Sequence, residues 1–393
     1  MRENCPVNAE QKTAAVLSDK SNDSAHSFLS AGSLYLRFIL IMKKFTITAL
    51  IFLGVLVCIS FTDQGLRHQY ARPASEWPAP WVDEGVSWSE LGALPPVPVD
   101  LNNDSVRQVV ELGKTLFFDP RLSSSGKISC ATCHDPALSW TDAKPRSVGH
   151  EGAIGNRNAP TVQNSWLYSK LFWDGRSRNL QDQAFAPIVS GVEMNSEMHD
   201  VVMKLRRSKT YRELFKKAFG SDFINPHVMT EAIAVFEKTI RSADSRFDRF
   251  VKGDYKALSN SELRGLHLFR TKARCINCHN SPLFSDNKFH YNGVSSTGPD
   301  NDKGYYTVTH NDNDLHKFRT PSLRDVMYTG PWMHNGKEKD LKALIELYHN
   351  DSPAPGGGRR QLGLTGKEKR DLLAFLGAIS APPLPFVKPV LPE

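Results

Sequence analysis

The sequence is poor in the patterns that define most other classes of protein. Strand-like alternation of polar and apolar residues is nearly absent. Lys and Arg outnumber Asp and Glu by only 49 to 42 and form no long basic run, which argues against nucleic-acid binding. With 40% hydrophobic and 23% charged residues in a chain of 393, a disordered chain and a multi-span membrane protein are excluded. What is left is a globular protein of about two domains.

Cysteine is scarce too, and the six cysteines leave no disulfide framework to build. Cys5 and Cys58 precede the folded region. The others form two copies of the pattern C-x-x-C-H, made by Cys130, Cys133 and His134 and by Cys275, Cys278 and His279. In this pattern two thiols bond to the side groups of one porphyrin and the imidazole binds its iron, so two copies predict two c-type haems. Paired C-x-x-C units also bind zinc, but the histidine after each pair favours haem.

A single long apolar run, from Phe45 to Phe61, follows Lys43 and Lys44. A basic start followed by an apolar stretch predicts an export signal, with cleavage near Phe61. An uncleaved N-terminal membrane anchor is the alternative, although the run is short for the roughly 20 apolar residues of a membrane span. The polar residues 1–41 lie oddly upstream of a signal, which suggests that synthesis starts at Met42.

Helical patterns recur around both cysteine motifs. Capping residues predict four helix starts, at Ser105 with Gln108, Asn225 with Pro226, Ser259 with Glu262, and Thr365 with Glu368. The phrase G-x-x-L-F occurs at 113–117 and again at 265–269, each time shortly before a cysteine motif. This repetition predicts an internal duplication of one helical module. The irregular connections 139–164 and 281–320 suit loops wrapped around a large prosthetic group.

Several stretches closely resemble the bacterial di-haem cytochrome c peroxidases and their relative MauG. They are residues 112–120, the first cysteine motif, and residues 155–161, 172–176 and 318–324. The resemblance covers roughly residues 105–380. It implies a periplasmic, all-α protein with two cytochrome c-like domains, each carrying one covalently bound c-type haem within long haem-wrapping loops.

The resemblance also implies a division of the chain. The expected parts are an upstream segment with a signal peptide or anchor (1–61), an extended Pro-rich lead-in (62–104), an N-terminal peroxidatic haem domain (105–250), a C-terminal electron-transfer haem domain (251–380) and a tail (381–393).

Around the first haem, the resemblance assigns a role to several residues. His134 becomes the iron ligand, Glu193 the acid/base group that moves a proton between the peroxide oxygens, and Gln183 its hydrogen-bonding companion. His150 matches a removable distal histidine, which implies a gating loop; a solvated loop histidine is the alternative. Trp173 falls where the family places an aromatic residue between the haems.

At the second haem, Tyr348 aligns where the simple peroxidases carry a methionine ligand, as it does in MauG. A phenolate stabilises oxidised iron and lowers the reduction potential. A packed core tyrosine is the alternative, with His349, Met327 and Met333 as spare ligands.

A calcium site is a further implication. Asn158, Thr329 and Pro331 match the family's calcium ligands, a side-chain amide and two backbone carbonyls, and ligation by oxygen alone suits one calcium ion.

Three functions follow from these residues. The leading one is a periplasmic peroxidase that reduces hydrogen peroxide to water with electrons from a small cytochrome c or copper protein. The second is a MauG-like oxidase whose irons share a high-valent state and act on a protein or another substrate. The third is a non-catalytic di-haem electron carrier, against which Glu193 and Gln183 argue. The sequence leaves the oligomeric state open; members of the family are often dimers, so a homodimer is considered by analogy alone.

Overall fold

The computed structural model of this chain describes residues 63–293 and 301–393, together with residue 39, residues 41–46 and residue 48. By their contacts, residues 1–62 and residues 63–393 form two separate units. In the first unit residues 41–46 are helical, whereas residues 49–61 of the predicted export segment lie outside the described residues. None of the described helices has the length and apolar character needed to cross a membrane.

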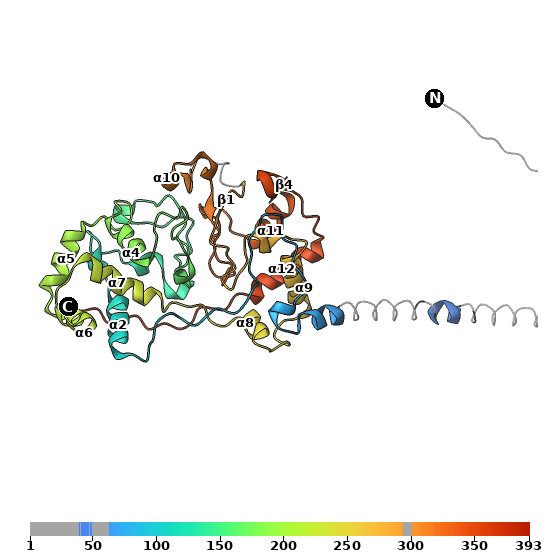
Figure 1. The fold of residues 1–393 in the computed structure, drawn as a ribbon, viewed down its shortest axis with the longest axis horizontal. Coiled ribbons are helices and arrows are strands. Elements are labelled where there is room, and N and C mark those ends of the chain that lie inside the picture. Colours follow the sequence, from blue (N-terminus) through green and yellow to red (C-terminus); the bar gives the residue numbers. More distant parts are fainter. Residues whose placement is uncertain (1–38, 40, 47, 49–62, 294–300) are drawn as a thin grey trace, which may run out of the picture. The chain divides into compact units, whose positions relative to one another are not determined.

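The second unit is built mainly of helices (Figure 1). They are α2 (Asp104–Phe118), α3 (Cys130–Cys133), α4 (Leu180–Val189), α5 (Met198–Arg207), α6 (Lys209–Phe219), α7 (Pro226–Glu237), α8 (Arg246–Val251), α9 (Asn260–Arg270), α10 (Tyr306–Thr309), α11 (Leu341–Asn350) and α12 (Gly366–Ala378), and residues 63–70 are helical as well. Long irregular segments join them, as the sequence predicts.

Strands are short where they occur. Two antiparallel ribbons pair β1 (Phe289–His290) with β2 (Phe318–Arg319) and β3 (Ser352–Pro353) with β4 (Arg359–Arg360). In register, Phe289 lies opposite Arg319 and Ser352 lies opposite Arg360. The first ribbon lies within the predicted irregular connection 281–320 and fastens its two ends together.

The predicted helix starts are confirmed at three of four places. Asn225 caps α7 with Pro226 in its first turn, and reciprocal capping boxes begin α9 and α12. The predicted start at Ser105 is wrong, because Asn103 caps α2 by accepting hydrogen bonds from the Ser105 and Val106 backbone amides. Asparagine is among the best N-cap residues, so the helix begins at the earlier position.

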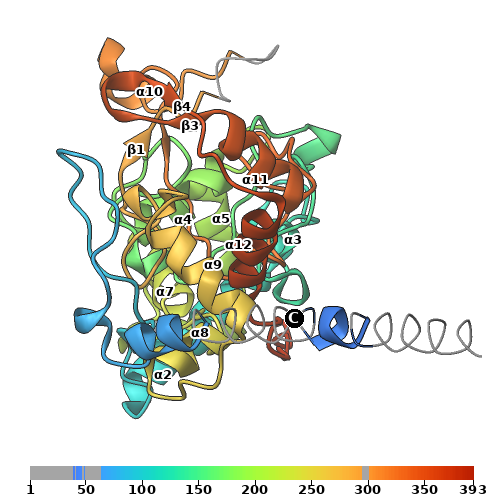
Figure 2. The same ribbon diagram turned by 90° about the vertical axis from the view of Figure 1, so that its right-hand side faces the viewer.

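Two helix pairs form the framework, and each depends on a glycine. Helix α2 packs on α7, and α9 packs on α12 (Figures 1 and 2). A Cβ atom at Gly113 would lie 1.9 Å from the Ala232 carbonyl oxygen, and one at Gly265 would lie 2.0 Å from the Asp371 carbonyl oxygen. The two copies of the G-x-x-L-F phrase therefore make the same close contact between backbones.

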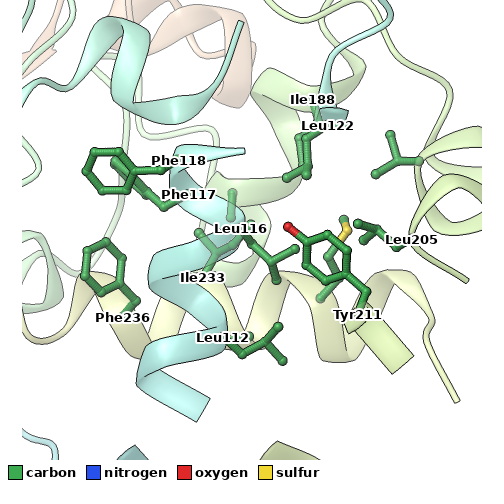
Figure 3. Close-up of a cluster of buried hydrophobic side chains, with 14 of the residues drawn as sticks. Leu112, Leu116, Phe117, Phe118, Leu122, Ile188, Leu205, Tyr211, Ile233 and Phe236 are labelled. Carbon is green, nitrogen blue, oxygen red and sulfur yellow. The ribbon is translucent and has the colours of Figure 1, made fainter. Parts of the chain in front are cut away.

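Each helix pair stands at the centre of its own hydrophobic core. Figure 3 shows part of the first core, where side chains of α2 and α7 meet: Leu112, Leu116, Phe117, Ile233 and Phe236. The second core is formed around α9 and α12 and includes Phe247, Phe269, Phe284 and Phe375. The aromatic and aliphatic side chains that surround both helix pairs leave each half with an apolar interior of its own.

The chain termini of this unit cross between the two cores. Tyr70, Trp77 and Leu91 of the lead-in are buried in the second core, whereas Phe386 and Leu391 of the tail pack against the first. Both crossings are fixed by polar contacts, since Arg270 Nε donates to Glu90 at 3.0 Å and Arg121 Nη2 donates to the Pro392 carbonyl at 2.7 Å. Each half thus takes part of its core from the opposite end of the chain.

Candidate functional site

The first cysteine motif lies on α3 and ends in a fixed histidine. His134 follows the helix directly and its Nδ1 donates to the Trp140 carbonyl at 3.1 Å. Burial lowers the pKa of His134, so the imidazole is neutral, the form that ligates metals. With Nδ1 committed to a carbonyl, Nε2 is the ring nitrogen that can bind iron.

A cavity of about 760 Å³ adjoins this motif, within the usual size range of cofactor sites. Its walls carry residues to which the sequence analysis gives a role at the first haem: Cys130, Cys133, His134, Trp173, Gln183 and Glu193. Among the buried wall atoms without a hydrogen-bond partner are Ser165 Oγ, Gln183 Oε1 and Glu237 Oε2. Buried polar atoms are normally paired, so the cavity is shaped for a group with polar parts of its own.

Glu193 and Gln183 reach the cavity from neighbouring segments. Gln183 lies on α4, and Glu193 follows the helix in a turn closed by its backbone amide, which donates to the Ser190 carbonyl at 3.0 Å. Burial raises the pKa of the Glu193 carboxyl, although the Arg176 guanidinium and the Ser190 hydroxyl counteract part of the rise. A carboxyl with a raised pKa holds a proton closer to neutral pH, as a proton-transfer group requires.

His150 lies beside this pocket, but its side chain is not in the cavity wall. Its backbone amide donates to the Glu193 carbonyl at 2.9 Å, and its Nδ1 lies 3.2 Å from Ser124 Oγ. The neighbouring Gly149 permits this contact, because a Cβ there would lie 2.0 Å from the Val192 carbonyl oxygen. Iron ligation by His150 stays a prediction.

Trp173 lies where the two halves meet. Its Nε1 donates to the Asn158 carbonyl at 2.9 Å, and its own carbonyl accepts from the Arg319 amide at 2.9 Å. Next to it, Arg157 pairs with Asp174 of the first half and Asp302 of the second. The indole is buried and held on both sides, so it has a fixed place between the regions that carry the two motifs.

The second motif repeats the histidine arrangement of the first. His279 Nδ1 donates to the Phe284 carbonyl at 2.9 Å, and burial lowers the pKa of this imidazole too. Cys275 and Cys278 are unpaired, as are Cys130 and Cys133, while Cys5 and Cys58 lie outside the described residues. Two unpaired thiols and a neutral imidazole at each motif fit a covalently bound c-type haem.

Tyr348 on α11 faces the second motif. Burial raises its pKa to about 12, and the nearby Cys278 and Cys275 act in the same direction. Asn292 Nδ2 lies 3.5 Å from the phenol oxygen. Two of the spare ligands are placed less favourably, because His349 Nδ1 accepts from the Leu364 amide and the Met327 side chain is 43% exposed.

The two motifs do not combine into one site. Within residues 63–293 and 301–393, no three His, Cys, Asp or Glu side chains gather closely enough to hold a metal ion. Cys130 packs against the first core and Cys275 against the second. A zinc ion shared by the two cysteine pairs therefore has no set of ligands in this part of the chain.

Comparison with known proteins identifies the family. Residues 107–256 match the family model described as di-haem cytochrome c peroxidase. The chain is 38% identical over 302 residues to the methylamine utilization protein MauG of Methylophilus methylotrophus, an alignment that covers 76% of this chain and 90% of that protein. This chain is a member of the di-haem cytochrome c peroxidase family.

Other relatives agree with this assignment. The cytochrome-c peroxidase IdrP1 of Denitromonas iodatirespirans is 41% identical over 337 residues, covering 77% of this chain and 89% of that protein. Among solved structures, a MauG-like protein associated with microbial copper homeostasis superimposes with a TM-score of 0.64 at 28% identity, covering 76% of this chain and 95% of the other. Membership of a di-haem family implies two c-type haems, in agreement with the two motifs.

The predicted calcium ligands of this family member lie in two segments. Asn158 is buried, its Nδ2 donates to the Lys144 carbonyl at 2.9 Å, and its backbone amide donates to the His334 carbonyl at 2.8 Å. Thr329 and Pro331 precede His334 by a few residues, so this hydrogen bond ties their segment to that of Asn158. Calcium binding there stays a prediction.

Two polar groups near the haem sites escaped the sequence analysis. Glu237, at the end of α7, lines the first cavity at 3% exposure, and burial raises its pKa to about 8. Near the second motif, His290 Nε2 lies 2.7 Å from Asp286 Oδ2. Burial disfavours the His290 imidazolium, but hydrogen bonds with Asp286 and Cys278 outweigh it and raise the pKa to about 10. The available signals were an acid within the apolar run of α7 and an Asp and His four residues apart.

Proposed function

We propose that this chain is a di-haem peroxidase that reduces hydrogen peroxide to water with electrons from a small redox protein. The observation that carries the proposal is the first cavity, which combines a C-x-x-C-H motif with an amide and a carboxyl on other segments. A non-catalytic electron carrier has no use for an acid/base group in such a place. Each haem would supply, when bound, an iron that exchanges electrons, and the one in the first cavity would supply the iron that reacts with peroxide.

Each of the two haems would be held by its own cysteine motif. Cys130, Cys133 and His134 would hold one in the domain at 105–250, and Cys275, Cys278 and His279 would hold the other in the domain at 251–380. Tyr348 would be the second ligand on the C-terminal side. His150 would cover the N-terminal site in the resting form and move away on activation.

Proton transfer is the task we assign to Glu193. Cleavage of the O–O bond requires a proton to move from the inner peroxide oxygen to the outer one, so that water can leave. Glu193 borders the cavity with a pKa raised by burial, and can accept that proton and return it. Gln183 Oε1 lines the same cavity without a partner and can accept a hydrogen bond that orients peroxide.

The test of this function is the Glu193→Gln variant of the haem-loaded protein. Peroxide turnover with a reduced cytochrome c as donor is expected to fall about 100-fold, since general acid/base groups typically contribute a hundredfold or more. Glu197→Gln is the matched control, because Glu197 is an exposed carboxylate four residues further along. Equal rates in both variants would remove Glu193 from the mechanism, and no turnover above that of free haem in the unaltered protein would defeat the peroxidase proposal.

Electrons would enter at the C-terminal haem and pass through Trp173. Its buried position between the halves, with hydrogen bonds to Asn158 and Arg319, supports this role. We also propose one calcium ion held by Asn158, Thr329 and Pro331, which would stiffen the same junction. Export to the periplasm by the predicted signal, a cytochrome c or copper protein as donor, and a homodimer complete the proposal.

Tyr348 favours a second candidate, an oxidase that acts on a protein or another substrate. A phenol beside the second motif, rather than the thioether of the simple peroxidases, would stabilise oxidised iron. The test is the absorption spectrum of the C-terminal haem in Tyr348→Phe, with Tyr291→Phe as control. An altered spectrum only in Tyr348→Phe supports ligation, whereas an unchanged spectrum means that the ring is merely packed. Absence of any long-lived oxidised form after peroxide addition to the ferric protein would count against the oxidase.

A further inference from the structure

Each half has a matching set of aromatic rings around the residue whose carbonyl binds its histidine. In the first half Phe117 lies 5.4 Å from Phe236 and 5.8 Å from Trp140, and Trp140 lies 6.1 Å from Phe236. In the second half the equivalent distances, among Phe269, Phe375 and Phe284, are 5.3, 5.9 and 6.2 Å. Trp140 and Phe284 are the residues whose carbonyls accept from His134 and His279. The rings therefore pack around the residue whose carbonyl orients each predicted iron ligand. We call each such set of rings, with the fourth ring described below, the aromatic wall.

The fourth ring of the wall has a different origin in each half. In the second half it is Phe247 of α8, which lies 5.4 Å from Phe284 and 5.8 Å from Phe375. In the first half it is Phe386 of the C-terminal tail, which lies 5.0 Å from Trp140 and 6.3 Å from Phe236. A segment from the far end of the chain thus takes the place that a neighbouring helix has in the other half.

The tail is held at this place by further contacts. Phe386 stacks on Phe118 at 5.5 Å, and the Lys114 ammonium lies 5.0 Å from its ring centre. Lys388 pairs with Asp135 at 3.6 Å. The next residue after Phe386 is different, since Val387 is 82% exposed. The tail therefore presents one specific ring to the wall and leaves its neighbour in solvent.

Trp140 depends on these packing contacts because its backbone conformation is unfavourable. Its φ of 60° lies in the left-handed region, as does that of Phe284 at 56°, a conformation that bulky residues adopt only when surrounding contacts enforce it. Ring packing against Phe117, Phe236 and Phe386 provides those contacts. If one ring is lost, the Trp140 peptide can relax and its carbonyl can move away from His134.

We propose that Phe386 is a positioning residue for His134, so that the C-terminal tail sets the properties of the first haem and leaves the second unaffected. The inference rests on the proposed function to the extent that His134 binds the iron of a haem. The hydrogen bond from His134 Nδ1 to Trp140 raises the basicity of the imidazole and fixes its plane. Weakening that bond makes the imidazole a poorer donor to iron, which raises the reduction potential of the first haem.

The experiment compares Phe386→Ala with Val387→Ala in the full-length, haem-loaded protein. The readouts are the reduction potential of each haem and the iron–histidine stretching band of the ferrous protein in resonance Raman spectra. In Phe386→Ala we expect a higher potential and a lower stretching frequency for the first haem, no change at the second, and peroxide turnover reduced by about tenfold at most. Phe386→Tyr, which keeps the ring, should restore the unaltered values.

Phe386→Leu serves if the alanine variant fails to fold, because leucine keeps apolar volume and removes only the ring. Values for the first haem equal to those of Val387→Ala, in a protein carrying two haems, would overturn the positioning role. Failure of the proposed function is separate from this outcome, because it would appear as two haems without peroxide turnover in the unaltered chain, while the stretching band still reports on Phe386.

Discussion

In the first half of the folded unit, the space beside the cysteine motif is bordered by an amide, a raised-pKa carboxyl and a buried acid, namely Gln183, Glu193 and Glu237. In the second half a phenol, that of Tyr348, lies close to the motif. The helices behind the two sites make the same contacts, down to a glycine at the same position of α2 and α9. The comparison teaches that one helical scaffold has been used twice and that loops and single side chains make the surroundings of the two motifs chemically different.

The strongest test of the shared scaffold is to place a methyl group in both helix contacts. Gly113→Ala and Gly265→Ala should each lower the free energy of unfolding by about 3 kcal/mol, because the new Cβ would meet a backbone oxygen that cannot move aside. Gly377→Ala on α12 is the control, since the nearest atom to its new Cβ would be the end of the Arg246 side chain at 3.8 Å. There the free energy of unfolding should rise by up to about 1 kcal/mol, because alanine favours a helix more than glycine does. Urea unfolding measures all three. If Gly113→Ala were as stable as the unaltered protein while Gly265→Ala lost stability, the two helix contacts would not be equivalent.

A smaller effect tests a position where the halves differ. Glu237 follows Phe236 on α7, whereas Leu376 follows the equivalent Phe375 on α12. The folded protein keeps the Glu237 proton up to a pKa of about 8, above the ordinary value of 4.5, while the unfolded chain releases it. Stability should therefore fall as pH rises from about 5 to 8, by on the order of 1 kcal/mol per pH unit or less.

Glu237→Gln removes this titration, so its advantage over the unaltered protein should grow across the same pH range. Glu231→Gln on the same helix is the control, because that side chain is 42% exposed and pairs with His227 at 3.6 Å. Thermal unfolding at pH 5 and pH 8 gives the comparison. Parallel pH curves for Glu237→Gln and the unaltered protein would mean that the buried acid keeps its ordinary pKa.

The smallest expected difference concerns how the two leading helices begin. Ser259 and Glu262 cap α9 reciprocally, whereas Asn103 caps α2 with its side chain alone. Both Ser259→Ala and Asn103→Ala should cost about 1 kcal/mol, with the larger loss at Ser259, because the Glu262 backbone amide that Ser259 caps is partly buried, whereas the amides that Asn103 caps are exposed to water. Chemical denaturation can resolve this ordering, and the reverse ordering would mean that burial of the capped amide does not decide the loss.

The sequence predicts well whatever depends on local patterns. The helices that begin at Asn225, Ser259 and Thr365 follow from capping residues and apolar spacing, and each cysteine motif ends in a histidine held by a carbonyl. The cavity also brings together Gln183 and Glu193, which the family resemblance had paired. These agreements are possible because the determining contacts lie within a few residues or within a known motif.

Contacts between distant segments could not be predicted in this way. No periodicity links Trp77 to Phe247 or Phe386 to Trp140, since such pairs depend on how the whole chain closes. The burial of Glu237 is another example, because its pKa depends on the surrounding walls rather than on neighbours in sequence. The cap at Asn103 was missed for a simpler reason, because two polar candidates two residues apart, Asn103 and Ser105, compete for one helix start.

The crossed ends of the folded unit also set an order of assembly during synthesis. Tyr70 is made early, but its hydrogen-bond partner His267 lies 197 residues later. The first core is complete only after Phe386 has been made. A chain released by the ribosome before residue 386 therefore lacks a piece of the first core, even when every residue of the second core has been made. Conversely, if the two halves were produced as separate polypeptides divided near residue 243, each would carry the missing piece of the other, and they should be able to reassociate into one complex.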